Sequence, residues 1–195
     1  GSQFPVFQKA PLYLRESLMF PYAEGLAFSN YVYEKQGKSG FDEVYRRPPS
    51  TTQQILHPEL YVERKEPARP LAPPAPKGYR ERDRGSIGEL DFRILLEQYA
   101  SKEISRELAP RWRGGSYRLF EKQDKPLLTF AAEWDSPESA QRFFDEYVKL
   151  LRKKWQRCEV REQTASRAAG TGQRGDFEIT LTGARVTSIE GLPSK

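Results

Sequence analysis

The sequence contains few of the residues from which catalytic and metal sites are built. Its 195 residues include one histidine, His57, and one cysteine, Cys158. Zinc sites take most of their ligands from histidine and cysteine, so one chain of this composition is not expected to assemble one. A single cysteine also excludes an internal disulfide framework. We therefore predict no metal site, no cofactor and no catalytic residue in this chain alone.

Long apolar segments and concentrated charge are also missing. No run approaches the roughly 20 apolar residues that a membrane-spanning helix needs, and charged residues make up 30% of the chain. The net charge of +5 is spread thinly along the sequence. Its one basic cluster, residues 152–157, stands at the expected end of a helix, where cations interact favourably with the helix dipole. We expect neither a membrane span nor a nucleic-acid partner.

The first third of the sequence has a helical pattern. Residues 1–66 form the expected helical region, in which Pro21 fits the first turn of a helix that continues through Gly25. A glycine inside a helix costs up to about 1 kcal/mol relative to alanine. We therefore expect Gly25 to mark a close helix–helix contact.

Aromatic residues crowd this helical region. The crowded set comprises Phe20, Tyr22, Phe28, Tyr31, Tyr33, Phe41 and Tyr45. Short helices cannot bury so many rings against one another. We expect some rings to pack on a later helix around residues 90–99 or on an upstream domain, and others to form an exposed patch or an oligomer contact.

A proline-rich segment separates the two halves of the chain. Prolines recur between residues 67 and 76, which is typical of an extended, polyproline-like connector. We assign residues 67–84 to this connector. The α+β unit then begins at residue 85, with helices expected over 86–109 and a capping box at Ser86–Glu89.

Near Gly115 the apolar residues change from a helical spacing to strict alternation. Residues 115–192 are predicted to form an antiparallel sheet of about four or five strands, with one long helix packed across it. Ser136 caps that helix, and the alanine- and glycine-rich segment 165–175 is expected to be a loose loop. The chain is therefore predicted to be α+β, with an α+β unit over 85–195 that follows the helical region.

Several segments resemble a bacterial zinc-metallopeptidase-like family of the gluzincin type. They are residues 20–25 and 48–61, with the Thr-x-Gln-x-Leu-His-Pro run, and later residues 111–117, Trp134-Asp135 and Phe143-Phe144. Members of the family carry a His-Glu-x-x-His helix upstream, and this chain lacks it. The resemblance implies a noncatalytic C-terminal portion or subunit that completes a cleft of a longer protein.

The same resemblance implies a setting for the chain. Zinc is expected only in the longer protein, and the partner is a missing upstream domain or another chain, with a homo-oligomer as a further option. Gly1 and Ser2 look like the remnant of a removed tag. We expect the natural protein to start upstream and to be secreted or periplasmic.

The resemblance also implies candidate site residues. In thermolysin-like peptidases, a histidine or tyrosine downstream of the metal helix hydrogen-bonds the oxyanion. His57, Tyr22 and Tyr61 are the candidates for this auxiliary role. The alternative for His57 is that its hydrogen bonds hold the turn at Pro58.

A second hypothesis needs no peptidase. The chain could be a standalone binding module for a peptide, a glycan or a protein, with aromatic residues on the sheet as its contacts. Trp112, Tyr117 and Trp134 are the candidate binding residues, although tryptophans also pack in cores. Cys158 fits a structural thiol, because a nucleophilic cysteine needs a histidine base close to it.

Overall fold

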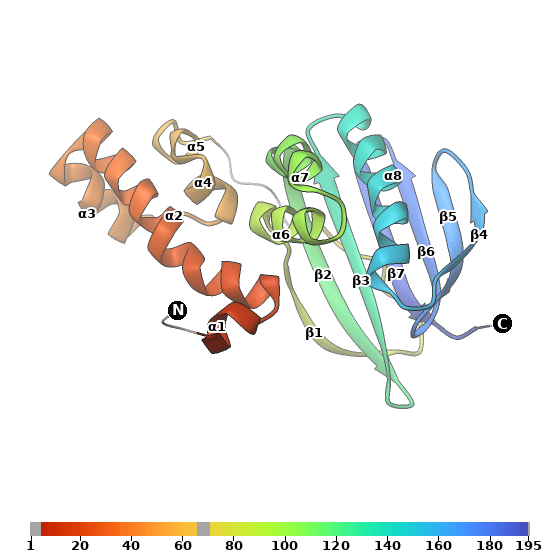
Figure 1. Ribbon diagram of the computed structural model, residues 1–195. Coiled ribbons are helices and arrows are strands. Elements are labelled where there is room, and N and C mark those ends of the chain that lie inside the picture. Colours follow the sequence, from red (N-terminus) through yellow and green to blue (C-terminus); the bar gives the residue numbers. More distant parts are fainter. Residues whose placement is uncertain (1–4, 66–70, 195) are drawn as a thin grey trace.

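The computed structural model describes residues 5–65 and 71–194 and confirms the α+β class. A group of helices stands beside a sheet that is covered on one face by further helices (Figure 1). The helices are α1 (Pro5–Lys9), α2 (Leu12–Gln36), α3 (Lys38–Arg46), α4 (Thr52–Leu56), α5 (Pro58–Val62), α6 (Glu89–Tyr99), α7 (Lys102–Leu108), the short 3-10 helix η1 (Ala109–Arg111) and α8 (Pro137–Lys154). The strands are β1 (Arg80–Ser86), β2 (Trp112–Lys122), β3 (Lys125–Trp134), β4 (Glu159–Gln163), β5 (Arg167–Gly172), β6 (Gly175–Thr182) and β7 (Arg185–Leu192).

The antiparallel sheet has seven strands in the order β1-β2-β3-β7-β6-β5-β4, so the predicted four or five was too few. The sequence pattern missed β1, which was assigned to the connector, and β5, which was assigned to a loop. All but one of the residues of β1 are exposed, and its charges are typical of an edge strand. In β5 the glycine at position 170 has a reason: a Cβ there would collide with the carbonyl oxygen of Glu159 in β4.

The hairpin of β2 and β3 was predicted from the alternation and is confirmed. Its two turn residues, Gln123 and Asp124, have φ angles of 52° and 58°. Two left-handed residues make the tight connection whose twist matches that of paired strands. The register continues from Lys122 opposite Lys125 to Trp112 opposite Trp134, with one irregularity near Gly114.

The main core lies between α8 and the sheet. Ser136 caps α8 as predicted, and its hydroxyl accepts a hydrogen bond from the nitrogen of Ser139. Trp134 stacks on Phe143 of α8, with ring centroids 4.4 Å apart. Trp112 is also buried in this cluster. The two tryptophans are 3% exposed or less, so the prediction that they contact a ligand at the surface is wrong.

The connector is extended and lies against the sheet. Residues 66–70 fall outside the described part, and residues 71–76 have no regular secondary structure. The segment passes behind the sheet, on the face away from α8 (Figure 1). Pro73 is buried, and Nζ of Lys122 in β2 lies 5.4 Å from the ring centroid of Tyr79. The connector therefore packs on the second face of the sheet.

The helical region differs from its predicted form at two residues. Pro21 lies inside the 25-residue helix α2 and not in a first turn. It is exposed, so water can reach the carbonyl that loses its helical donor there. Gly25 has no atom within 4 Å of a notional Cβ, so the predicted close contact is wrong. The close contact of α2 with α3 is at Gly40, whose notional Cβ lies 2.8 Å from Cγ1 of Val32.

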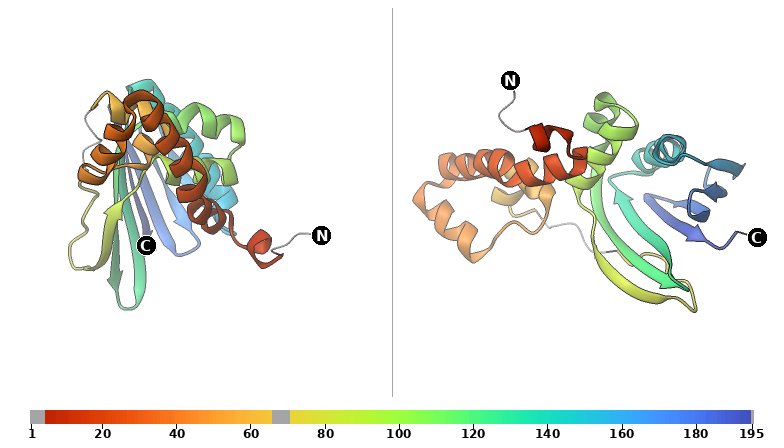
Figure 2. Two further views of the ribbon diagram at one scale, coloured as in Figure 1. Left: turned by 90° about the vertical axis from the view of Figure 1, so that its left-hand side faces the viewer. Right: turned by 60° about the horizontal axis from the view of Figure 1, so that its bottom comes forward.

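The helical region docks on the α+β unit through α2, α4 and α6 (Figure 2). Phe20 of α2 packs with Leu90 and Ile94 of α6. Gln53 of α4 is buried and donates a hydrogen bond of 2.9 Å to the carbonyl oxygen of Trp112. The prediction that aromatic residues of the first third pack on residues 90–99 is confirmed for Phe20.

The start of α6 also differs from the predicted capping box. Ser86 ends β1, and the residue before the helix is Gly88. Asp91 accepts a hydrogen bond of 2.7 Å from the nitrogen of Gly88. The predicted partner, Glu89, instead points away to His57, and this pair lies in the site described next.

Candidate functional site

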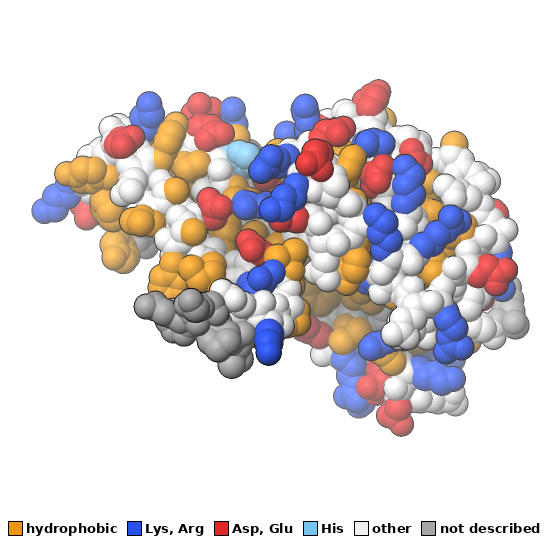
Figure 3. Space-filling model, in the orientation of Figure 1, with side chains coloured by type: hydrophobic (Ala, Val, Ile, Leu, Met, Phe, Trp, Pro, Cys, Tyr) orange, Lys and Arg blue, Asp and Glu red, His pale blue; other side chains and the backbone are white. Residues whose placement is uncertain are grey.

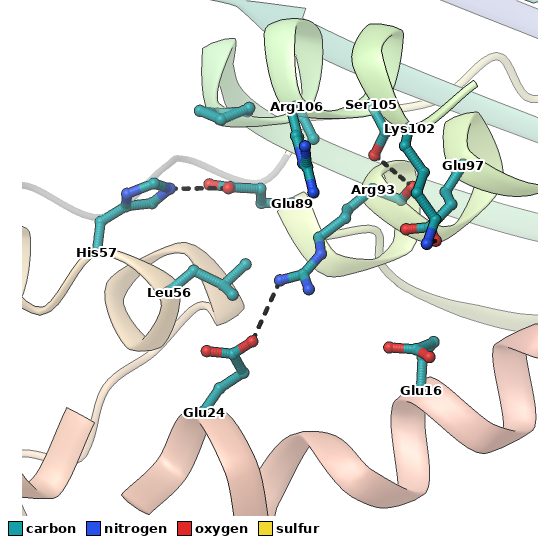
Figure 4. Close-up of a pocket in the computed structure, with 12 residues that line it drawn as sticks. Glu16, Glu24, Leu56, His57, Glu89, Arg93, Glu97, Lys102, Ser105 and Arg106 are labelled. Atoms are coloured by element: carbon teal, nitrogen blue, oxygen red, sulfur yellow. Dashed lines mark hydrogen bonds and ion pairs between the residues drawn. The ribbon is translucent and has the colours of Figure 1, made fainter. Parts of the chain in front are cut away.

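A charged cleft of about 430 Å³ opens where the helical region meets α6 and α7. Figure 3 shows blue and red side chains gathered there beside the pale blue His57, and Figure 4 shows how they lie. Its charged lining comprises Glu16, Glu24, His57, Glu89, Arg93, Glu97, Lys102 and Arg106. The charged side chains of the cleft therefore come from three helices, α2, α6 and α7, and from His57, the residue between α4 and α5.

His57 and Glu89 form the central pair of this cleft. The Nε2–H of His57 donates to Oε1 of Glu89 at 2.8 Å, and Nδ1 lies 3.8 Å from a carboxylate oxygen of Glu59. The hydrogen bond that His57 donates to Glu89 raises the pKa of His57, while partial burial opposes this rise. The Glu89 side chain is only 3% exposed, and a buried carboxylate is stable only when it is paired. The pair thus favours imidazolium next to carboxylate.

The geometry around His57 suits a structural contact between the helical region and the α+β unit better than a site of proton transfer. Nε2 of His57 is engaged by Glu89, and Nδ1 lies 3.8 Å from Glu59, beyond hydrogen-bond distance. Because the raised pKa of His57 favours the imidazolium, Nδ1 carries a proton in that form and can accept no other. The hydroxyl of Ser105, which also lines the cleft, donates to the carbonyl oxygen of Arg93 at 2.7 Å. Within residues 5–65 and 71–194, no three His, Cys, Asp or Glu side chains are placed to hold a metal ion.

Other ion pairs cross the cleft in the same way. Arg93 of α6 reaches Glu24 of α2 at 3.3 Å, and Lys102 reaches Glu97 at 3.5 Å (Figure 4). Both pairs are at least partly exposed, so each contributes less than about 1 kcal/mol. The Arg93–Glu24 pair, together with the His57–Glu89 pair, connects the helical region to the α+β unit, whereas Lys102 and Glu97 both belong to that unit.

The predicted auxiliary residues do not gather around His57. Tyr61 is fully buried, and its hydroxyl donates to the carbonyl oxygen of Arg47 at 2.7 Å. Burial raises the pKa of Tyr61. Tyr22 is 74% exposed on α2. Tyr61 is therefore a core residue and Tyr22 a surface residue, and neither lines the cleft.

The other predicted residues have different surroundings. Tyr117 is half-buried and donates to Oδ2 of Asp83 at 2.8 Å, and this bond raises the pKa of Tyr117. It lines a separate apolar pocket. Cys158 is partly buried, and burial raises the pKa of its thiol. A nucleophilic cysteine needs the opposite shift, which supports the structural assignment of Cys158.

A second candidate site is the outer surface of α2 and α3. Nine large apolar side chains are exposed there: Tyr13, Leu14, Leu18, Met19, Tyr22, Leu26, Tyr33, Phe41 and Tyr45. We call this set the α2–α3 apolar surface; orange side chains cover this part of the molecule in Figure 3. The prediction that part of the aromatic set is exposed is confirmed.

One stripe of this surface was readable in the sequence. Leu14, Leu18, Tyr22 and Leu26 recur every four residues, so they lie along one side of α2. The buried residues Phe20, Phe28 and Val32 take the other side. The number of aromatic residues indicated that the helical region has an exposed surface. The four-residue spacing of Leu14, Leu18, Tyr22 and Leu26 also indicates which side of α2 is exposed.

Comparisons with known proteins say little about function. No helix in the described part of the chain is long and apolar enough to cross a membrane. A search of the curated proteins and a search of the solved structures gave no match. One family model matches residues 76–195, which is more than half of the chain and contains all seven strands. The chain therefore belongs to the family described as Domain of unknown function (DUF8575).

Proposed function

We propose that the chain is a noncatalytic interaction module that binds a protein partner through the α2–α3 apolar surface. The observation that carries this proposal is the exposure of nine large apolar side chains on two adjacent helices. The exposed fractions run from 42% to 87%, which amounts to roughly 800–1,300 Å² if a large side chain has about 150–250 Å². The largest apolar patch of a typical monomer is about 300–600 Å². Each partner in a standard interface contributes about 800 Å².

The charged cleft fits this function as a structural joint. Ion pairs of His57 with Glu89 and of Arg93 with Glu24 fix the helical region against the α+β unit. A surface held in place before binding loses less conformational entropy when the partner arrives. The cleft thus supports the interaction surface without catalysing a reaction.

A peptidase-related role is the second form of this proposal. An upstream zinc domain is one partner that would cover the exposed side of α2, as the resemblance implies. Zinc analysis of the longer natural protein, beside this chain, tests it. Stoichiometric zinc in the longer protein would support this form, and zinc in neither would remove it.

The main proposal is tested by placing charge on the stripe. Without its partner, the wild-type chain is expected to self-associate as its concentration rises, and to bind a dye that fluoresces on apolar surfaces. Leu18→Glu with Leu26→Glu should abolish both effects, because these side chains are 60% and 62% exposed. Sedimentation velocity and dye fluorescence provide the measurements.

The matched control adds the same charge elsewhere. Gln156→Glu with Gln173→Glu alters two exposed positions outside the helical region, and should leave self-association and dye binding unchanged. A wild-type chain that stays monomeric at every concentration and binds no dye would overturn the proposal. So would equal effects of the two double variants.

A further inference from the structure

A second pocket, of about 500 Å³, lies between α6 and the strands β2 and β3. Its walls are mainly apolar and aromatic, and include Leu95, Tyr99, Tyr117, Leu128, Phe130 and Tyr147. Pockets of about 300–1,000 Å³ with apolar walls and few polar groups are typical of small-molecule sites. One residue of the α2–α3 apolar surface, Tyr13, also lines this pocket, so the two adjoin there.

One part of the pocket lining carries the carboxylate of Asp91, each oxygen of which already accepts a hydrogen bond. Oδ1 of Asp91 accepts a hydrogen bond of 2.9 Å from the hydroxyl of Tyr13. Oδ2 accepts the hydrogen bond from Gly88 at the start of α6. Another anion would be repelled here, because Asp91 keeps its negative charge when neutral donors bind it. Asp91 therefore disfavours a ligand carboxylate at its own position.

Another part of the lining carries the ammonium group of Lys154, which can donate a hydrogen bond to a ligand. Lys154 is the only Lys or Arg among the described residues that line the pocket. Its Nζ lies 3.3 Å from Oε2 of Glu190, and an ammonium has three donors. The other oxygen of Glu190 accepts from the hydroxyls of Tyr147 and Ser188. The negative charge of Glu190 is thus shared among three donors, and Lys154 keeps donors for a ligand.

We propose that this pocket binds an apolar monocarboxylic acid, such as a medium-chain fatty acid. The carboxylate accepts a hydrogen bond from Nζ of Lys154, because hydrogen bonds between charged groups are the strong ones. The apolar body lies along Leu95, Leu128 and Phe130, where it leaves water. The negative charge of Asp91 fixes the orientation, since it repels a carboxylate at its own position.

Calorimetric titration of the full chain with decanoate, decanol and decylamine tests the proposal. Decanoate should bind one-to-one, and about tenfold more tightly than the alcohol or the amine, which corresponds to about 1.4 kcal/mol. Lys154→Met should weaken decanoate binding about tenfold and leave decanol binding unchanged. Lys153→Met, at the exposed neighbouring residue, is the control and should change neither.

Leu95→Trp fills the pocket and should block all three ligands, while circular dichroism checks that the fold is intact. If Lys154→Met does not fold, the proposal is still tested by Leu95→Trp and by the comparison of decanoate with decanol. The proposal is overturned if the wild-type chain does not bind decanoate, or binds decanol equally well. Unchanged affinity of a folded Lys154→Met chain for decanoate would overturn it too.

Discussion

The hydroxyl of Thr52 in α4 lies 3.3 Å from the backbone nitrogen of Leu90, in the first turn of α6. Gly88, the residue before α6, has no side chain that could accept this hydrogen bond. A Cβ on Gly88 would lie 2.5 Å from the same hydroxyl oxygen. Thr52 therefore provides the cap that Gly88 lacks, and it does so from another part of the chain.

Removing this borrowed cap should destabilise the fold. Thr52→Ala is expected to lower the free energy of unfolding by about 1 kcal/mol, as loss of a helix cap does. Adding Gly88→Ser to Thr52→Ala should restore part of the lost free energy of unfolding. The serine supplies its own hydroxyl, the threonine oxygen no longer blocks its Cβ, and Gly88 already has an extended backbone with φ of −99°. Urea unfolding measures both, and Thr182→Ala, at an exposed strand position, is the control. No recovery in the double variant would contradict the cap assignment.

Stability should depend on pH through His57. The folded-state pKa of His57 is raised above its usual 6.5 by Glu89, so protonation and folding favour each other. The stabilisation that protonated His57 contributes is fully present below the pKa of His57 in the unfolded chain. It is lost as pH rises through the pKa of His57 in the folded chain. The difference in unfolding free energy between wild type and His57→Asn should be largest near about pH 6 and smaller near about pH 9. A difference that grows with pH would contradict this assignment, and NMR titration of the ring reports the pKa directly.

Glycines 25 and 40 should respond in opposite directions to alanine. Gly40→Ala is expected to destabilise the fold by about 1–3 kcal/mol, because its Cβ would meet Val32 at 2.8 Å and Gln36 at 2.9 Å. Gly25→Ala has open space around its Cβ and should stabilise the helix by up to about 1 kcal/mol. Thermal and urea unfolding measure both. Equal effects would mean that Gly40 does not form the close contact of α2 with α3.

The buried hydroxyl of Tyr147 should matter for stability. Tyr147→Phe removes its hydrogen bond to Glu190, a carboxylate that is itself buried. Loss of one partner of a buried charged group costs about 1–3 kcal/mol. Tyr45→Phe makes the same chemical change at a residue that is 87% exposed, and should be neutral. If both variants unfold at the same urea concentration, Glu190 is held by Lys154 and Ser188 alone.

Local patterns predicted much of the α+β unit. Ser136 and the apolar stripe located α8, and the alternation over residues 117–134 located the β2–β3 hairpin. Caps, helical spacing and tight turns depend on residues close in sequence, so they can be read from it. The strand β1 has exposed charges and β5 has small residues, and neither shows the apolar alternation that marks a strand.

The sequence by itself determined the α+β class, the extended connector, the shortage of metal ligands and the excess of aromatic residues in the helical region. Only the tertiary structure decided how distant residues pair: His57 with Glu89, Thr52 with Leu90, and Gly40 rather than Gly25 as the close contact. The tertiary structure also decided that Trp112 and Trp134 are buried and that Tyr22 is exposed. The reason is physical: hydrogen bonds and burial depend on which surfaces meet after folding, and residues 32 to 38 positions apart carry no local signal of that meeting.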